Sequence, residues 1–146
     1  MEQLLMNSTS SQTFRKKRCV GYARVSTQEQ AEEGYSIDAQ IQTIQEYCQR
    51  ENMECVGVYV DRGKSGKNIK GRPEMQQLLH DAENGDFDAV VVWKISRVAR
   101  NLMNLLEIVN VLQKQDIAFY SISETFRVDT TTGRFMLQIM ASVNEL

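Results

Sequence analysis

One serine and four arginines stand close to segments of this chain that are expected to form strands. Ser26 follows one apolar segment directly, and Arg24 lies two residues before it. Three further arginines follow other apolar segments at Arg72, Arg97 and Arg100. Guanidinium groups bind phosphate oxygens and stabilise the charge that develops on them during reaction. The set therefore suits phosphoryl transfer, with Ser26 as the candidate nucleophile.

Two other kinds of chemistry fit the sequence less well. The single histidine, His80, is expected on a helix with ordinary neighbours, which favours a partly exposed surface residue over a catalytic base. Asp61 stands alone at the expected end of a strand, without the clustered carboxylates that hold catalytic metal ions. A serine hydroxyl needs help to lose its proton. We expect that help to come from the arginines, with no metal ion and no cofactor.

The three cysteines are Cys19, Cys48 and Cys55. Their number is odd and no two of them have the short spacing of a zinc-binding pair. This pattern favours buried or idle thiols in a reducing cytosol over a disulfide framework or a zinc site.

Alternating strand and helix patterns would position the candidate residues. Apolar segments at 19–24, 56–60, 89–93 and 117–122 predict strands. Helical spacing predicts three helices between them, the first capped by Ser36, the second beginning near Pro73 and ended by Gly85, the third beginning near Asn101. This order predicts an α/β fold with a mostly parallel sheet of four to five strands flanked by helices. Ligands gather at the carboxyl ends of such strands, where Ser26 and the arginines would meet.

The two ends of the chain have different patterns. Residues 1–17 lack apolar periodicity and are predicted to be a flexible leader, before a domain at 18–131. From Thr132 a long helix is predicted, and its apolar residues occupy most of its circumference. A helix of this kind must be covered on several sides. We therefore expect residues 132–146 to begin an oligomerisation helix in a chain that continues further.

Charge and composition limit the function classes. Apolar residues make up 42% and charged residues 25% of the chain, as in globular proteins. No apolar run approaches the roughly 20 residues of a membrane helix, and no export signal is recognisable, so we expect a cytoplasmic protein. The net charge is −2, but the segments 62–72 and 90–106 contain basic residues and no acids. A basic face of this kind can bind phosphate in a nearly neutral molecule, although a solvated loop is the plainer interpretation.

Several separated motifs resemble those of the serine site-specific recombinases, the resolvase, invertase and integrase family. They run in order from Arg18 to Leu146 and comprise Tyr22–Gln30 (YARVSTQEQ), Ser36–Gln40 (SIDAQ), Asp61–Gly66 (DRGKSG), Gly71–Pro73 (GRP), Lys94–Asn101 (KISRVARN) and Gly133. The four residues 32–35, inserted before the first helix, look more like the large serine integrases and transposases than the small resolvases. The resemblance implies a resolvase-like catalytic domain.

The resemblance also implies a role for each matching residue. Ser26 would attack a DNA phosphate, forming a 5′-phosphoserine bond and releasing a 3′ hydroxyl, before strand exchange and religation. The four arginines would bind the scissile phosphate. The remaining matches would position these groups or contact phosphate, and they are Tyr22, Gln30, Gln40, Ser65 and Ser96. Many relatives have an aspartate where this chain has Ser96, which leaves the proton-transfer group undecided.

Partners follow from the same resemblance. It implies double-stranded DNA as the substrate, on a mobile genetic element of a bacterium or phage. It also implies a homodimer that assembles into a synaptic tetramer through the last helix. The sequence leaves open whether an accessory factor controls the direction of exchange. Two alternatives remain: a catalytically inactive module of the same fold that oligomerises or tethers DNA, and a flavodoxin-like small-molecule phosphatase. A phosphate-binding loop of the Walker type is absent from the sequence.

Overall fold

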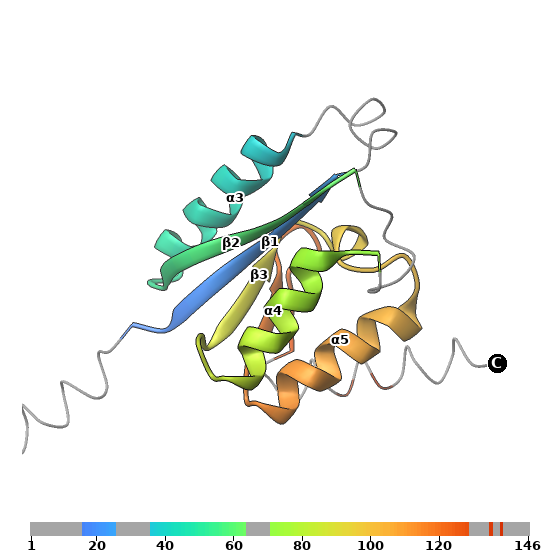
Figure 1. Ribbon diagram of the computed structural model, residues 1–146. Helices are drawn as coiled ribbons and strands as arrows, with labels where there is room; N and C mark the ends of the chain where they lie inside the picture. Colours follow the sequence, from blue (N-terminus) through green and yellow to red (C-terminus); the bar gives the residue numbers. More distant parts are fainter. Residues whose placement is uncertain (1–15, 26–35, 64–70, 129–134, 136–137, 139–146) are drawn as a thin grey trace, which may run out of the picture.

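The computed structural model describes residues 16–25, 36–63, 71–128 and the single positions 135 and 138 (Figure 1). Within these ranges a five-stranded sheet has the order β2-β1-β3-β4-β5. The strands are β1 (Arg18–Val25), β2 (Glu54–Arg62), β3 (Ala89–Val92), β4 (Ala118–Ser121) and β5 (Phe126–Arg127). All neighbours are parallel except β4 and β5, which are antiparallel. The predicted α/β fold with a mostly parallel sheet is confirmed.

The strands agree with the sequence patterns in position but differ in length. The second strand is longer than the five predicted residues, because β2 continues to Arg62 alongside the whole of β1. The two-residue strand β5 has no sequence signal of its own. It forms because the turn after β4 folds Phe126 back against Ser121.

Each helix begins and ends where its terminal residues favour a break. In α3 (Ile37–Arg50) the Ser36 side chain accepts a hydrogen bond from the Ala39 amide, as the cap prediction required. Helix α4 (Pro73–Glu83) starts with proline in its first turn and is followed by Gly85 at φ +72°. In α5 (Leu102–Lys114) the Asn101 side chain caps the Asn104 amide. These caps satisfy amides that have no partner inside the helix.

Alternation along β1 sends its side chains to two different layers. Val20 and Tyr22 belong to the core that contains Leu78 of α4 and Leu105 of α5. Cys19 belongs to the core on the other face, which contains residues of α3. Figure 1 shows α3 on one side of the sheet, with α4 and α5 on the other. Because successive strand residues point to opposite faces, Arg24 lies on the same face as Tyr22.

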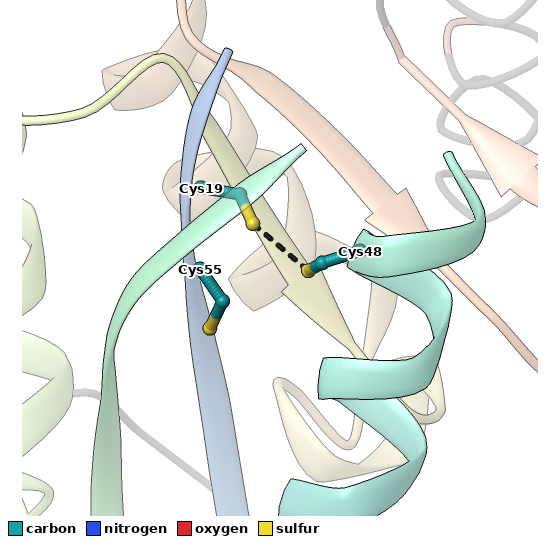
Figure 2. A group of neighbouring side chains, drawn as sticks. All are labelled: Cys19, Cys48 and Cys55. Atoms are coloured by element: carbon teal, nitrogen blue, oxygen red, sulfur yellow. Dashed lines mark hydrogen bonds between the residues drawn. The ribbon is translucent and has the colours of Figure 1, made fainter. Parts of the chain in front are cut away.

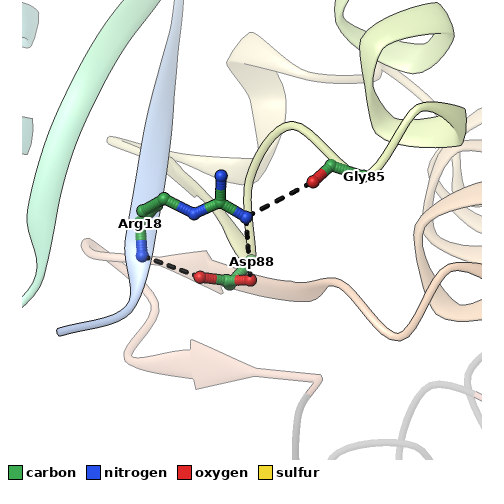
Figure 3. Close-up of polar contacts among 3 residues, drawn as sticks. All are labelled: Arg18, Gly85 and Asp88. Carbon is green, nitrogen blue, oxygen red and sulfur yellow. Dashed lines mark hydrogen bonds and ion pairs between the residues drawn. The ribbon is translucent and has the colours of Figure 1, made fainter. Parts of the chain in front are cut away.

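Arg18 fastens the beginning of β1 to the loop that precedes β3. Its amide donates to Asp88 at 2.9 Å, and its guanidinium donates to the Gly85 carbonyl at 3.3 Å (Figure 3). The guanidinium also lies 3.6 Å from the other Asp88 oxygen. The pair is partly exposed, so its Coulomb energy is screened. Its effect is mainly to set the register in which β1 and β3 begin.

The ends of the chain fall largely outside the described residues. This holds for residues 1–15 of the predicted leader and for most of the predicted last helix, of which positions 135 and 138 are helical. The division into leader, domain and oligomerisation helix therefore stays a prediction. Among the described residues, no helix has the length and apolar character needed to cross a membrane.

Candidate active site

The candidate site lies where the strand order reverses. β1 is flanked by β2 on one side and by β3 on the other, although β2 precedes β3 in the chain. The helices after β1 and β3 therefore cover opposite faces, and open α/β sheets bind ligands at the carboxyl ends of the strands at such a reversal. Arg24 stands at this end of β1, and the short 3₁₀ helix η1 (Ile95–Arg97) follows β3 at the same end.

Arg24 is buried and its guanidinium is held by the backbone of η1. Its Nε donates to the Arg97 carbonyl at 3.0 Å, and its Nη2 donates to the Ser96 carbonyl at 2.7 Å. The side chain is 1% exposed. Carbonyl oxygens satisfy the donors but bring no formal negative charge. The contact therefore orients a cation without neutralising it.

Gln40 holds the backbone of the same arginine from the opposite side. Its side-chain oxygen accepts from the Arg24 amide at 3.3 Å, and its amide group donates to the Arg24 carbonyl at 3.1 Å. The two bonds resemble a strand pairing and tie α3 to the end of β1. Gln40 is fully buried, and buried polar groups need hydrogen-bond partners of this kind.

Arg72 reaches the same end of β1 from the start of α4. Its guanidinium donates to the Val98 carbonyl and lies 5.9 Å from the centre of the Tyr22 ring. Both side chains are fully buried. A guanidinium above an aromatic face is attracted by the ring, most strongly where water is excluded. This stacking brings Arg72, some 50 residues away in sequence, to the neighbourhood of Arg24.

Asp61 is the residue of this region whose function the sequence did not reveal. Its carboxylate accepts from the Tyr22 hydroxyl at 2.8 Å and from the amides of Glu74 and Met75 at 3.1 Å each. The residue before α4 is Arg72, whose side chain does not cap the helix. Asp61, at the end of β2, supplies this cap instead. Its negative charge also interacts favourably with the positive end of the helix dipole. The sequence did contain a signal for this role, because the residue directly before Pro73 is not a typical helix cap, so a distant side chain had to supply one.

Arg97 completes the buried cations. It is fully buried, and its guanidinium carbon lies 5.0 Å from the centre of the Trp93 ring. Lys94 also lies over this ring, at 4.8 Å. Trp93 follows β3 directly and was predicted only as the last residue of that strand. Both cations therefore contact one aromatic ring directly after the end of β3.

The cations affect one another's ionisation. Burial lowers the pKa of Arg24 below its ordinary value, and the charge of Arg100 lowers it further, although Tyr22 and Asp61 oppose this. Burial also lowers the pKa of Arg97, with a further contribution from Arg24. Both pKa values are lowered because positive charges lie close together in a region with little water. A bound anion would relieve this repulsion.

The other predicted site residues have different positions. Arg100 and Ser96 are exposed, although the Ser96 carbonyl holds Arg24. Ser26, Gln30 and Ser65 lie outside the described residues. Ser26 is nevertheless joined to Val25, the last residue of β1, whose carbonyl accepts from the Gly63 amide at 2.7 Å. Arg24, Arg72 and Arg97 thus gather at the strand end that leads into Ser26.

Comparison with known proteins identifies the family. The family model described as "Resolvase, N terminal domain" matches residues 19–146. This chain belongs to the resolvase family. Among curated proteins, it is 30% identical over 141 residues to the probable DNA-invertase y4cG of Sinorhizobium fredii, covering 97% of this chain and 40% of that protein. It is 30% identical over 127 residues to the DNA-invertase hin of Salmonella typhimurium, covering 87% and 59%.

Solved structures agree with this membership. The N-terminal catalytic domain of TP901-1 integrase is 38% identical, with a TM-score of 0.82, over 88% of this chain and 95% of that one. A resolvase family site-specific recombinase from Streptococcus pneumoniae is 30% identical, with a TM-score of 0.75, over 89% and 87%. The resemblance to serine recombinases and the resolvase-like fold are therefore confirmed. This chain spans about half the length of three of its curated relatives, 40% of the y4cG invertase, 60% of the Tn917 resolvase and 59% of the hin invertase.

Two side predictions can also be compared with the structure. His80 is exposed on α4, in agreement with the interpretation as a surface residue. The cysteines are free, and Cys19 and Cys48 are buried as expected. No short sequence spacing pairs them, yet their three sulfur atoms lie within 4.8 Å of one another. Residues from β1, α3 and β2 meet there by packing, which short sequence spacings cannot indicate.

Proposed function

We propose that this chain is the catalytic domain of a site-specific DNA recombinase in which Ser26 is the nucleophile. One observation carries the proposal. Arg24, Arg72 and Arg97, all buried, gather at the carboxyl end of the strand that leads directly into Ser26. Desolvated, oriented cations of this kind stabilise the charge of a reacting phosphate far better than solvated ones. The membership of the family, with relatives named invertase, resolvase and integrase, supports DNA as the substrate.

The proposed step transfers the DNA phosphoryl group from a 3′ oxygen to the Ser26 oxygen. The Ser26 oxygen forms a bond to phosphorus, and the bond between phosphorus and the 3′ oxygen breaks. The proton of the serine hydroxyl passes, overall, to the leaving 3′ oxygen. The phosphoserine link conserves the energy of the broken phosphodiester bond. Religation can therefore reverse the step without a nucleotide cofactor. The guanidinium groups supply the positive charge that metal ions provide in many other phosphoryl transfers.

Buried contacts indicate how the arginines keep their positions. Gln40 fixes the backbone of Arg24, and Asp61 fixes Tyr22, on which Arg72 stacks. These are positioning residues in the proposal, since they hold the cations rather than the phosphate. Preorganisation of this kind matters because a displacement of about 1 Å at a reacting centre can cost roughly a hundredfold in rate.

The oligomeric state is part of the same proposal. Phe135, in the segment predicted to be the last helix, is 60% exposed. The sequence predicts that this helix is apolar around most of its circumference, and such a helix needs cover on several sides. We infer a homodimer that assembles further on DNA. Sedimentation of the chain should reveal a dimer or tetramer, whereas a monomer at high concentration would oppose the inference.

The small-molecule phosphatase alternative has less support. A cavity of about 330 Å³ opens at the amino ends of the strands, away from the arginines, and it is lined in part by Lys17, Asp88 and Asp116. Two carboxylates oppose the binding of a phosphate ester there. The arginine cluster, in turn, is held by backbone carbonyls rather than arranged around this cavity.

A covalent-adduct assay tests the nucleophile. The full-length protein is incubated with a nicked duplex carrying its recombination site, and the products are separated on a denaturing gel. We expect a protein–DNA adduct attached at a 5′ end. Ser26→Ala should abolish the adduct, whereas Ser123→Ala, at an exposed serine in the turn after β4, should leave it unchanged.

Three results would reject parts of the proposal. An adduct that persists in Ser26→Ala would reject Ser26 as the nucleophile. A protein that oligomerises on DNA but forms no adduct would favour the inactive tethering module. Hydrolysis of a small phosphate ester, without any adduct, would favour the phosphatase.

A further inference from the structure

Three sulfur atoms meet on the face of the sheet opposite the arginines. Cys19 lies in β1, Cys48 in α3 and Cys55 in β2 (Figure 2). Their sulfur atoms all lie within 4.8 Å of one another, and those of Cys19 and Cys48 are 2.8 Å apart. They are the only cysteines of the chain. Three independent elements therefore bring every thiol of the protein to one point.

The surroundings of the sulfur cluster are apolar and largely closed. Cys19 is fully buried and Cys48 is 1% exposed, whereas Cys55 is half-buried. Met53, a second kind of sulfur side chain, belongs to the same core cluster. The side chains of Tyr22 and Arg24 point to the other face of the sheet, so the cluster takes no part in the proposed reaction. Cys55 gives the cluster its route to solvent.

We propose that Cys19, Cys48 and Cys55 form a binding site for one soft, thiophilic metal ion of the Cu(I) class. Sulfur ligands select soft ions over hard ones. With metal–sulfur bonds of about 2.3 Å, three sulfurs around one ion stand about 4 Å apart, which agrees with the observed spread. The Cys19 and Cys48 sulfurs would have to separate by about 1 Å to reach that arrangement.

The number of ligands favours Cu(I) over zinc. Structural zinc sites almost always have four protein ligands. Within the ranges that the structure describes, no histidine, aspartate or glutamate joins the three thiols. Cu(I) accepts three sulfur ligands, so the three thiols supply enough ligands for that ion.

Occupation of the site would join β1, β2 and α3. A ligand that binds the folded chain and not the unfolded one raises its stability. The same helix carries Gln40, which holds the backbone of Arg24. The ion would therefore stabilise the part of the fold on which the arginine cluster depends.

A competition titration tests the proposal. The reduced chain is titrated anaerobically with Cu(I) in the presence of a coloured Cu(I) chelator, and thermal unfolding is measured with and without the ion. We expect one Cu(I) per chain and a higher unfolding temperature. X-ray absorption at the copper edge should count three sulfur neighbours.

Variants separate the cluster from adventitious binding. Cys55→Ser, at the half-buried ligand, should fold and should weaken binding by about a hundredfold or more, since even the loss of a partner outside the ligand shell costs 10- to 100-fold. Met103→Leu, at a methionine that is 50% exposed, should change nothing. Met53→Leu should leave the count of sulfur neighbours at three.

Several results would overturn the proposal. Unchanged affinity in Cys55→Ser would do so, as would two sulfur neighbours or an unfolding temperature lowered by Cu(I). If Cys55→Ser does not fold, Cys55→Ala at the same position replaces it. A reduced wild-type chain that loses all Cu(I) to the chelator would also refute the site.

Discussion

The hydroxyl of Tyr22 donates to the carboxylate of Asp61 at 2.8 Å, and both groups are buried. This bond joins the middle of β1 to the end of β2. The same carboxylate caps α4, and the Tyr22 ring supports Arg72. One hydrogen bond thus connects two strands, a helix start and a cation of the candidate site.

Removal of the Tyr22 hydroxyl should destabilise the fold. Tyr22→Phe keeps the ring under Arg72 but leaves a buried carboxylate with one donor fewer. We expect a loss of about 1.5–3 kcal/mol in the free energy of unfolding, the range for hydrogen bonds to charged groups. Urea denaturation measures it. Tyr59→Phe is the matched control, because Tyr59 donates to Asp81 on the surface side of α4, and its effect should be smaller. Equal losses would contradict the assignment.

Alkaline pH should weaken the fold through the same tyrosine. Burial raises the pKa of Tyr22 above its ordinary value, the charge of Arg72 opposes this, and the bond to Asp61 adds to it. The folded chain therefore holds this proton more tightly than the unfolded chain. Its contribution to stability is complete below the ordinary tyrosine pKa of about 10 and is lost as the pH rises above it.

Urea midpoints measured between about pH 8 and pH 11 check this dependence. The fall in stability should be shallower in Tyr22→Phe than in the wild type. Tyr59 has a raised pKa for similar reasons, first burial and then its bond to Asp81, so it should contribute to the fall in both proteins. Identical slopes would show that Tyr22 titrates alike in the folded and unfolded chains.

Arg97 should not be replaceable by lysine. Lysine keeps one positive charge but loses the planar guanidinium that lies over Trp93. If Arg97 stabilises the reacting phosphate as proposed, Arg97→Lys should slow adduct formation roughly 10²–10³-fold, as the loss of one preorganised donor does elsewhere. Single-turnover cleavage of the nicked duplex measures the rate.

Arg62→Lys is the matched control for this substitution. Arg62 is exposed at the end of β2 and is the first residue of the basic segment 62–72. Its replacement should leave the rate nearly unchanged. Both variants should be compared at a temperature at which urea denaturation shows them folded. A rate for Arg97→Lys equal to that of Arg62→Lys would remove Arg97 from the phosphate site.

Gly21 should tolerate no side chain. A Cβ atom built there would lie 2.9 Å from Ile44 Cγ2, where α3 packs on β1. Gly21→Ala should therefore lower the free energy of unfolding by about 1–3 kcal/mol, the usual cost of overpacking. Gly57→Ala, in β2, meets no atom within 4 Å and should change stability by less than about 0.5 kcal/mol. The difference between the two midpoints in urea is the test.

Much of the architecture was predictable from local sequence. Periodic apolar positions located the first four strands and three helices, because strands and helices repeat their buried faces at different intervals. Ser36 and Pro73 indicated where helices begin, since capping depends on a few neighbouring residues. The family resemblance rested on motifs of this local kind. Each can be read without knowing how distant segments pack.

The relations between distant side chains were decided by the tertiary structure alone. Asp61 appeared to stand alone in the sequence, yet it caps a helix that begins at Pro73, some twelve residues later. Cys19, Cys48 and Cys55 have unrelated spacings and still meet. Strand order and helix placement bring such groups together, and neither is encoded in the spacing of any one segment. The sequence determined which residues are candidates for the chemistry, and packing determined which of them touch.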